Sequence, residues 1–332
     1  MNTPSRMNYI QITQPGGPQV LELAQAEVPQ PGPQDLLIKV HAAGINRPDV
    51  LQRAGHYPMK PGMSPVPGLE VAGEVVAIGD DVTGFKVGDT VCALTNGGGY
   101  AEYCLAPATQ TLPIPEGLDM VHAAAIPETF FTVWANLFEL GQAEPGKTVL
   151  IHGGTSGIGT TALMLCKALG IKAFATAGSE KKCEQIRALG GEAINYREAR
   201  FTEVIARHTE DKGVDVILDI MGASYFEDNV AALARRGRLV IIGFLGGGTV
   251  KDFKLGTIMD KQGVITGSMM RSRSAEEKAE IAQALQANVW PLLAQGQCTP
   301  IIDRVFSLAE AADAHAWMEE GSHIGKIVLS VV

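Results

Sequence analysis

The chain has few cysteines and no paired cysteine motif. Its 332 residues include only Cys92, Cys104, Cys166, Cys183 and Cys298, and no two of them stand in CxxC spacing. An odd, scattered set of this kind is typical of a reducing compartment rather than of a disulfide framework. Because the first residues also lack the pattern of a secretory signal, we expect a cytoplasmic protein.

Long uncharged runs and an excess of basic charge are missing as well. The two longest segments without Asp, Glu, Lys or Arg, Thr148–Cys166 and Ile281–Ile302, are interrupted by glycines or by polar residues and Pro291. Neither is therefore expected to span a membrane. The 27 basic and 36 acidic residues give a net charge of −9. This balance disfavours broad binding to nucleic acid or to an anionic membrane, although a local basic pocket remains compatible with it.

Glycine and proline are abundant instead, with 38 and 18 residues, and they divide the chain into two patterns. Between Asp35 and Leu112 the apolar runs are short and strand-like, with turn residues between them, which predicts a β-barrel-like unit. After Pro127 strand-like and helical runs alternate as far as Met270. This alternation predicts an α/β unit with a doubly wound, six-stranded parallel sheet, the Rossmann arrangement.

The C-terminal tail has a different character. Two capping boxes, Ser274 with Glu277 and Ser307 with Glu310, predict two helices, and Gly325–Val331 is strand-like. Because the alternating region ends before this tail, we expect the tail to return to the first unit. The predicted domains are residues 1–127 with 271–332, and residues 128–270.

A glycine-rich loop carries the clearest functional signal. The strand-like Thr148–His152 is followed by Gly153-Gly154-Thr155-Ser156-Gly157-Ile158-Gly159 and then by the helical Thr160–Leu169. Glycines there allow a pyrophosphate to approach backbone amides and the positive end of a helix. The spacing is GxxGxG rather than GxGxxG, but the strand, loop and helix at the first crossover predict dinucleotide binding.

Two other patterns do not fit their context. Gly141–Thr148 matches the phosphate-loop pattern GxxxxGK[ST], but it follows a helical segment and leads into a strand, which is the reverse of what that loop requires. Gly154-Thr155-Ser156 begins like a hydrolase nucleophile elbow, but Ile158 stands where GxSxG requires glycine. We interpret the first as a solvated turn and reject the second.

The choice between NADH and NADPH depends on the end of the second strand. An NAD site usually has an Asp or Glu there for the ribose hydroxyls, whereas this chain has Thr176-Ala177-Gly178-Ser179, followed by Lys181 and Lys182. Hydroxyl and ammonium donors suit a 2′-phosphate, so the sequence favours NADPH. The alternative is that the lysines form a solvated helix face, with Glu180 offsetting their charge.

Further motifs complete a family resemblance over nearly the whole chain. They are Ala43–Asp49 with Gly55–Tyr57, Pro67–Gly73, Val87–Asp89, the glycine loop and Ile324–Val328. Together they resemble the zinc-independent quinone oxidoreductases of the medium-chain dehydrogenase/reductase superfamily, and most of all the p53-inducible quinone oxidoreductase type. The resemblance implies a GroES-like β-barrel catalytic domain beside the Rossmann domain. It also implies a homodimer or a tetramer, with sheet edges paired near Val264–Gly267.

The chain departs from the zinc-dependent relatives at the ligand positions. Asn46, Leu69 and Glu128 stand where those relatives hold their catalytic ligands, and Leu69 has no lone pair. A neutral amide and one carboxylate do not make the three strong ligands that catalytic zinc requires. Cys92 and Cys104 stand alone, so the four-cysteine structural lobe is absent too. We expect no metal.

The resemblance then implies metal-free hydride transfer from NADPH to a small acceptor that accepts hydride readily, a quinone or an activated alkene. Asn46 and Tyr57 are the expected catalytic residues: Asn46 would hold the nicotinamide or the substrate oxygen, and Tyr57 would line the acceptor pocket. A turn role for Asn46 and a core role for Tyr57 remain open. The expected cofactor contacts are Asn46, Thr132, Gly154, Thr155, Ser156, Gly157, Ile158, Gly178, Ser179, Lys182, Tyr196, Gly243, Phe244, Met269 and Lys326.

Two other functions remain open at this point. Related reductases of 2-alkenals and enoyl thioesters carry a tyrosine at the place of Tyr57 to protonate carbon. A thioester of coenzyme A or a carrier protein would require several basic residues at the entrance of the substrate site. Lys60 is the only lysine in the Tyr57–Met63 stretch, which favours small quinones. Other relatives are NADPH-binding structural or RNA-binding proteins with weak turnover. The acidic net charge disfavours RNA.

Overall fold

The computed structural model describes residues 3–57, 59 and 63–331, and the chain divides into two compact units. Unit 1 consists of Met1–Phe131 together with Ser274–Val332, and unit 2 consists of Thr132–Arg273. The C-terminal tail thus belongs to the same unit as the N-terminal half. Among the described residues, no helix combines the length and the apolar character needed to cross a membrane.

Unit 2 is built on a parallel sheet, as the alternating pattern predicts. In spatial order the described strands are β10 (Glu192–Asn195), β9 (Lys172–Ala177), β8 (Thr148–Ile151), β11 (Val214–Asp219), β12 (Leu233–Ile241) and β13 (Val264–Gly267). All five neighbouring pairs are parallel. The predicted six-stranded, doubly wound sheet is confirmed. The chain reverses its direction of winding between β8 and β11, which is where such sheets bind their ligands.

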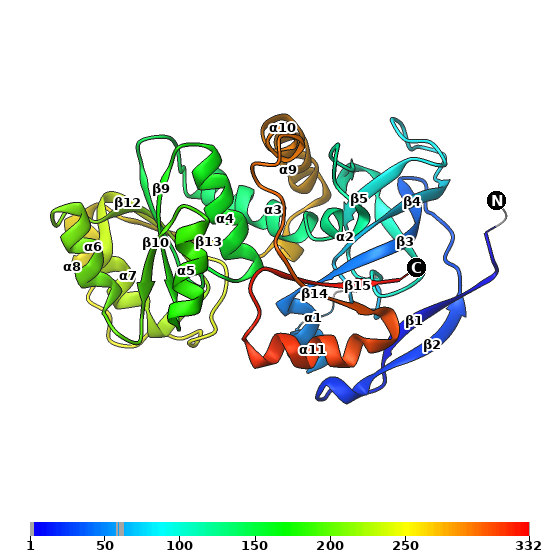
Figure 1. The fold of residues 1–332 in the computed structure, drawn as a ribbon, viewed down its shortest axis with the longest axis horizontal. Coiled ribbons are helices and arrows are strands. Elements are labelled where there is room, and N and C mark those ends of the chain that lie inside the picture. The colour runs from blue at the N-terminus through cyan, green and yellow to red at the C-terminus, as the bar shows by residue number, and fades with distance from the viewer. Residues whose placement is uncertain (1–2, 58, 60–62, 332) are drawn as a thin grey trace. The chain divides into compact units, whose positions relative to one another are not determined.

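Helices cover both faces of this sheet. Figure 1 shows α4 (Gly157–Ala168) and α5 (Glu180–Ala188) on one face, with α6 (Phe201–Thr209), α7 (Phe226–Ala232) and α8 (Gly256–Lys261) on the other. Buried Leu150, Phe174 and Ile217 anchor a core between sheet and helices. Helix α4 begins at Gly157 rather than at the expected Thr160, because Ser156 caps it.

Unit 1 contains a mixed sheet. In the part of the chain that the structure describes, its order is β14 (Ile302–Ser307), β15 (Lys326–Ser330), β3 (Asp35–Ile45), β4 (Glu70–Ile78), β5 (Thr90–Leu94) and β7 (Thr111–Pro113), and β6 (Tyr103–Pro107) also pairs with β3. Strands β1 (Arg6–Ile12) and β2 (Leu21–Glu27) form an antiparallel pair that the sequence analysis does not predict. Strand β15 pairs with β3, so segments far apart in the sequence lie side by side (Figure 1).

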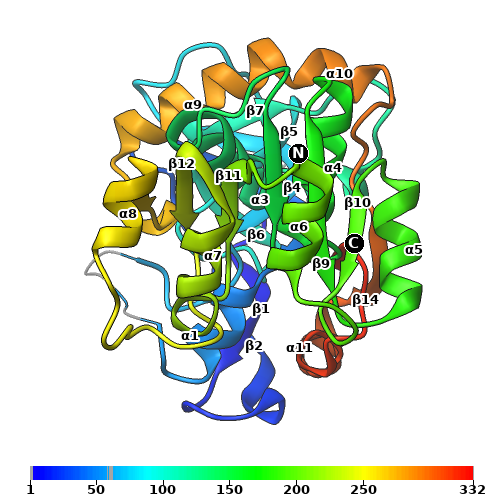
Figure 2. The ribbon, with the colours of Figure 1, turned by 90° about the vertical axis from the view of Figure 1, so that its left-hand side faces the viewer.

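Helices of unit 1 surround this sheet. They are α1 (Arg47–Arg53), α2 (Met120–Ala123), α9 (Ala275–Asn288), α10 (Trp290–Ala294) and α11 (Ala311–Glu320). Figure 2 shows α1, α9, α10 and α11 from a second direction. The first capping box starts α9: Ser274 N donates to Glu277 Oε2 and Glu277 N to Ser274 Oγ. The second starts a 3-10 turn, Leu308–Glu310, just ahead of α11.

The remaining short elements connect these layers. Helix α3 (Pro127–Val133) passes from unit 1 into unit 2 and continues as a π-helical turn, Trp134–Leu140. Further 3-10 turns are Pro18–Val20, Ala108–Gln110, Gly222–Ser224 and Met270–Ser272. π-Helical turns are rare and occur often at functional sites.

Candidate functional site

The glycine loop of unit 2 connects β8 to α4 at the carboxyl end of the sheet. Gly154 N donates to Thr176 O at 2.9 Å and Gly153 N donates to Thr176 Oγ1 at 3.2 Å, so the loop is bound to β9. A Cβ atom at position 154 would collide with Ile186 and Ala175, and one at position 159 with backbone atoms of Gly153 and Gly154. The loop requires glycine at both positions because it packs against α5, β9 and itself.

The loop leaves backbone donors at the start of α4. Ser156 Oγ accepts from Gly159 N at 3.0 Å and donates to Gly153 O at 2.8 Å. The amides of Gly157 and Ile158 belong to the first turn, which has no intrahelical acceptors. They point from the positive end of the helix dipole, where anions bind. This donor set fits a pyrophosphate.

His152 is connected to the glycine loop through hydrogen bonds. Its Nε2 lies 2.7 Å from Asn229 Oδ1 and its Nδ1 lies 3.2 Å from Thr176 Oγ1. An amide oxygen accepts, so Nε2 carries the proton, and Nδ1 accepts from the Thr176 hydroxyl. Burial lowers the pKa of His152 to about 4. The imidazole is therefore neutral. It orients the Thr176 hydroxyl that accepts from Gly153 N, so its role is structural.

The expected contacts of a 2′-phosphate lie together at the ends of β9 and β10. A Cβ at Gly178 would collide with the Tyr196 hydroxyl, so that hydroxyl lies directly against Gly178, and the Tyr196 side chain is exposed. Ser179 Oγ caps α5 by accepting from Lys182 N at 3.4 Å. No carboxylate follows β9 directly.

The first carboxylate of α5 is engaged elsewhere. Glu180 Oε1 lies 2.7 Å from Arg187 Nη1, a residue about two helical turns further along α5. This ion pair reduces the repulsion that Glu180 would exert on an anion near Ser179 and Lys182. The alternative that Glu180 offsets the lysine charge is thereby weakened.

The expected nicotinamide contacts follow β12 and β13. Gly243 and Phe244 come after β12 and Met269 after β13, and the side chains of Phe244 and Met269 are 64% and 55% exposed. Thr132 lies in α3, where its carbonyl accepts from Asn136 Nδ2 at 2.8 Å. Ser268 Oγ donates to Asn136 Oδ1 at 2.8 Å, so the π-helical turn is bonded to the segment after β13.

Unit 1 holds a second polar group, made by side chains. Lys326 Nζ lies 2.7 Å from Glu70 Oε1, 2.5 Å from Asn46 Oδ1 and 3.0 Å from Ile45 O. Asn46 Nδ2 donates to Glu70 Oε1 at 2.8 Å. Asn46, Glu70 and Lys326, here termed the Asn46 cluster, are all buried. The structure thus brings together two expected site residues, Asn46 and Lys326, through Glu70.

Glu70 is the member that the sequence analysis does not identify as a site residue. It begins β4 next to the end of β3, and a Cβ at Gly44 of β3 would collide with its Oε1. Glycine at position 44 therefore provides the space for the carboxylate. The available signal is a glutamate in the otherwise apolar Leu69–Ala72 segment, since a charge at a buried strand position needs a partner.

Asp49 holds the backbone of the same turn. Its Oδ2 accepts from Asn46 N at 2.8 Å and from the Tyr100 hydroxyl at 3.1 Å, and its Oδ1 accepts from Gly68 N at 3.1 Å. Burial raises the pKa of Asp49 to about 6, and these hydrogen bonds oppose that rise. Asp49 therefore orients the loop that contains Asn46 and Gly68.

A buried chain of contacts continues from Tyr100 to the surface. The Tyr100 hydroxyl lies 3.1 Å from His315 Nε2, and His315 Nδ1 lies 3.3 Å from Arg53 Nη1. Arg53 pairs with Glu319 at 2.9 Å. Burial, together with the charge of Arg53, lowers the pKa of His315 to about 3. His315 is neutral and connects the two partners.

The Asn46 cluster does not fit a catalytic zinc. The Lys326 ammonium already binds Asn46 Oδ1 and Glu70 Oε1, and Glu70 Oε2 accepts from Glu128 N at 2.8 Å. Leu69 has no lone pair to offer. Burial and the charge of Glu70 raise the pKa of Glu128 to about 7. Among the described residues, no group of three or more His, Cys, Asp or Glu side chains could hold a metal ion.

Tyr57, the other expected catalytic residue, lies in a bend after α1 and is half-buried. Residues 58 and 60–62, next to it, lie outside the described residues, and Lys60 is one of them. The role of Tyr57 at an acceptor pocket therefore stays a prediction.

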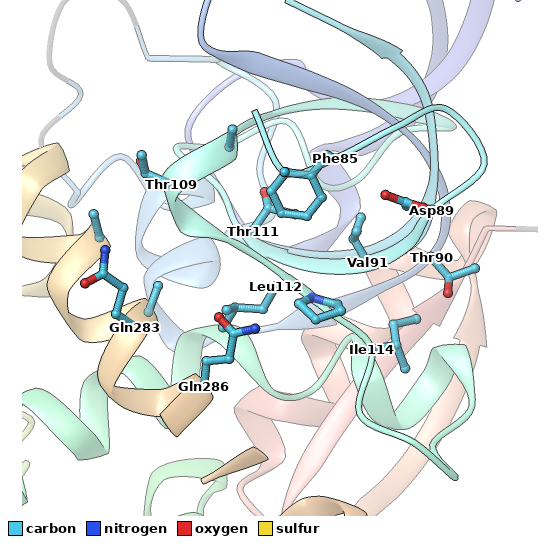
Figure 3. A pocket seen from close by; sticks show the side chains of 15 residues that line it. Phe85, Asp89, Thr90, Val91, Thr109, Thr111, Leu112, Ile114, Gln283 and Gln286 are labelled. Carbon is cyan, nitrogen blue, oxygen red and sulfur yellow. The ribbon is translucent and has the colours of Figure 1, made fainter. Parts of the chain in front are cut away.

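Unit 1 also contains a pocket of about 590 Å³. Gln283 and Gln286 of α9 line one side, and Phe85, Thr111 and Leu112 line another (Figure 3). It includes none of the expected site residues, so it is separate from the Asn46 cluster.

Two protein families match the chain. Residues 32–116 match the family described as alcohol dehydrogenase GroES-like domain, and residues 157–287 match that described as zinc-binding dehydrogenase. The chain is 35% identical over 328 residues to a quinone oxidoreductase of Rattus norvegicus, with 97% of each chain covered.

Solved structures agree on the fold. One is a mycobacterial protein complexed with NADPH, with 29% identity, a TM-score of 0.87, and coverage of 98% of this chain and 100% of that one. Another is an NAD-dependent alcohol dehydrogenase, with 31% identity, a TM-score of 0.86 and the same coverage. The predicted GroES-like domain with a Rossmann domain is confirmed.

Proposed function

Because the chain belongs to the medium-chain dehydrogenase/reductase superfamily, as a relative of its quinone oxidoreductases, we propose that it is an NADPH-dependent quinone reductase. The observation that carries this proposal is the Asn46 cluster, in which an ammonium, an amide and a carboxylate bind one another where zinc-dependent relatives bind metal. A site of this kind suits acceptors that take hydride without a Lewis acid. Quinones are such acceptors.

The cofactor would bind along the carboxyl edge of the unit 2 sheet. The amides of Gly157 and Ile158 suit the pyrophosphate, and Ser179, Lys182 and Tyr196 suit a 2′-phosphate. Thr155 and the exposed Phe244 and Met269 are proposed as further contacts. The preference for NADPH over NADH rests on the hydroxyl and ammonium donors beyond β9, and on the absence of a carboxylate between Thr176 and Ser179.

In the proposed reaction NADPH supplies hydride, and one further proton converts the quinone to a hydroquinone. The chain's own contribution is to hold the two reactants together and to exclude water, which accounts for much of the rate in cofactor enzymes of this kind. The Asn46 cluster stays fixed throughout because each of its charged groups already has partners.

The test follows oxidation of NADPH or NADH at 340 nm with a chelator present. The acceptors are 1,4-benzoquinone, 9,10-phenanthrenequinone, a 2-alkenal and crotonyl-coenzyme A. We expect turnover of the quinones with NADPH and little with the alkenes. Preference for the alkenal or the thioester would contradict the proposal and would give Tyr57 the role of proton donor. Tight NADPH binding without turnover would indicate a binding protein.

We further propose a homodimer formed at the outer edge of the unit 2 sheet. Among the described residues β13 pairs only with β12, and Val264, Leu255 and Met259 near this edge are exposed. An exposed edge strand with apolar neighbours is a template for pairing with a second copy. Val264→Lys should convert a dimer to a monomer in light scattering, whereas the exposed control Val87→Lys in unit 1 should not. A wild-type chain that is monomeric at micromolar concentration would contradict this proposal.

A further inference from the structure

The first residue of the glycine loop needs a constraint from outside the loop. Gly153 has a φ of 71° and Gly154 follows it, so two residues with large backbone freedom stand next to each other. Thr176 of β9 holds both: its hydroxyl oxygen accepts from Gly153 N at 3.2 Å, and its carbonyl oxygen accepts from Gly154 N at 2.9 Å. The geometry of the loop therefore depends on the Thr176 hydroxyl.

The constraint on Gly153 extends to the start of α4. Gly153 O accepts from Ser156 Oγ at 2.8 Å, and the same Oγ accepts from Gly159 N at 3.0 Å as the helix cap. A change in the backbone of Gly153 would therefore move an acceptor away from the cap. The amides of Gly157 and Ile158, which are proposed to bind the pyrophosphate, belong to this first turn.

The direction of each hydrogen bond behind Thr176 follows from one amide oxygen. Asn229 Oδ1 can only accept, so His152 Nε2, at 2.7 Å, carries the proton and Nδ1 is an acceptor. Nδ1 lies 3.2 Å from Thr176 Oγ1, so the hydroxyl gives its single hydrogen to the imidazole. The lone pairs of the hydroxyl oxygen are then left for Gly153 N. Asn229 thus determines how the Thr176 hydroxyl faces the loop.

The Asn229 amide is itself oriented. Asp219 ends β11, where its carboxylate accepts from Met221 N at 2.7 Å and from Gly222 N at 3.0 Å. Burial raises the pKa of Asp219, and the Asn229 side chain is among the groups that oppose this rise. Because Asn229 Oδ1 is bound to His152, the amino group of the amide is the end that faces the carboxylate. A reversed amide would place two oxygens against each other.

The imidazole ring is held on two sides. The rings of Phe201 and Tyr225 meet it edge-on, each with a centroid distance of 4.9 Å. His152 is 1% exposed and Asn229 is 0% exposed, so water does not compete for their hydrogen bonds. The imidazole therefore keeps both its plane and its tautomer.

We propose that Asn229 and His152 are positioning residues for the cofactor, and that through the Thr176 hydroxyl they hold the glycine loop in the geometry that binds a dinucleotide. These three residues are termed the His152 network. This inference rests on the dinucleotide binding of the proposed function. The network contributes affinity because a loop of glycines that is already ordered pays less conformational entropy on binding.

The first experiment removes the hydroxyl. Thr176→Val keeps the shape of the side chain and the carbonyl bond to Gly154 N, while Gly153 N loses its acceptor. The Kd values for NADPH and NADH, measured by nicotinamide fluorescence, should both rise about fivefold to tenfold, because both cofactors contain the pyrophosphate. The kcat at saturating NADPH should change by less than about twofold.

Thr209→Val is the matched control. The Thr209 hydroxyl also accepts from a glycine amide, Gly213 N at 3.0 Å, but these residues lie between α6 and β11, at the amino end of the sheet. This variant should keep the wild-type Kd for both cofactors. An equal rise of Kd in the two valine variants would show a general effect on unit 2 and would overturn the inference.

The second experiment removes the orientation of the hydroxyl. His152→Phe keeps a ring between Phe201 and Tyr225 but removes the acceptor of the Thr176 hydroxyl. We expect the Kd for both cofactors to rise about fivefold. In the double variant with Thr176→Val the losses should not multiply, because there is no longer a hydroxyl to orient. Multiplied losses, or a wild-type Kd in His152→Phe that melting curves show to be folded, would overturn the inference.

Amide hydrogen exchange of the cofactor-free chain gives a readout that does not involve the cofactor. The Gly153 amide should exchange about fivefold to tenfold faster in Thr176→Val and in His152→Phe than in wild type. The Gly213 amide should exchange faster only in Thr209→Val. A merely structural network would speed exchange throughout unit 2 instead. That result, or unchanged exchange at Gly153, would overturn the inference.

The same measurements separate this inference from the proposed function. A wild-type chain that binds NADPH but does not reduce quinones would contradict the proposed quinone reductase activity, and the Kd and exchange values would still decide the role of the His152 network. A wild-type chain that binds neither NADPH nor NADH would overturn both.

Discussion

The two polar sites of this molecule are built in opposite ways. In unit 2 the glycine loop offers backbone amides of consecutive residues, and its side chains serve mainly to cap and to pack. In unit 1 the Asn46 cluster consists of side chains from three strand ends, two of them charged and all of them buried. A backbone site tolerates changes in most side chains but not in its glycines. A site of buried charges depends on every member, because each charge is stable only beside its partner.

The largest effect should come from breaking the buried ion pair. Lys326→Met leaves Glu70 charged and without its ammonium, which should destabilise the chain by about 3–5 kcal/mol in denaturant unfolding. Lys147→Met, which removes an exposed ion pair with Glu144, should cost less than about 1 kcal/mol. Adding Glu70→Gln to Lys326→Met should restore most of the lost stability. Equal effects of the two lysine changes would show that unit 1 does not depend on its charges as we infer.

The next largest loss of stability should come from filling the space that Gly44 leaves for the Glu70 carboxylate. Gly44→Ala places a Cβ against Glu70 Oε1 and Ala124 O, and should destabilise by about 2–3 kcal/mol. Gly256→Ala in α8 is the control, because a Cβ there meets no atom within 4 Å. It should be neutral or stabilising, as alanine favours helices. Thermal melting of both variants compares the two sites directly, and a tolerated Gly44→Ala would contradict the packing argument.

Glu128 adds a pH-dependent contribution. Its pKa is raised from 4.5 to about 7, so the folded chain disfavours its ionised form. The contribution of the protonated Glu128 carboxyl to the free energy of unfolding is fully present below pH 4.5, and it is lost as pH rises through 7. The free energy of unfolding of Glu128→Gln should therefore equal that of wild type near pH 5. At pH ~8.5 it should be higher than that of wild type by about 2 kcal/mol. Unfolding at both pH values measures this, and a constant difference would refute the assignment.

The smallest effect concerns the cofactor preference. Lys182→Ala should lower the affinity for NADPH by about fivefold to tenfold and leave NADH nearly unchanged, as one charge-assisted contact is lost. Lys181→Ala is the neighbouring control, since its side chain is more exposed. Fluorescence titration with both cofactors gives the ratio. If neither lysine changes the ratio, the lysines are a solvated helix face.

Local patterns predicted the fold of unit 2 well because its elements are made by adjacent residues. The strands Thr148–Ile151 and Val264–Gly267 and the capped helix Glu180–Ala188 follow directly from apolar runs and cap residues. Unit 1 was harder. The strands β1 and β2 alternate too weakly to stand out. The sequence predicted the strand Gly325–Val331 and the return of the tail to the first unit, but not β14 or the pairing of β15 with β3. Pairing over such separations leaves no local signal.

The parallel sheet, the glycine loop and the absence of a carboxylate after β9 follow from the sequence alone, whereas the Ser156 cap and the start of α4 at Gly157 come from the structure. The features that follow from the sequence depend on hydrophobic periodicity and on residues a few positions apart, both of which can be read from the sequence. The position of Glu70 between Asn46 and Lys326 and the orientation of the Asn46 amide depend on the folded chain. Those contacts join residues separated by up to 280 positions, and the pairing of β15 with β3 brings them within hydrogen-bonding distance.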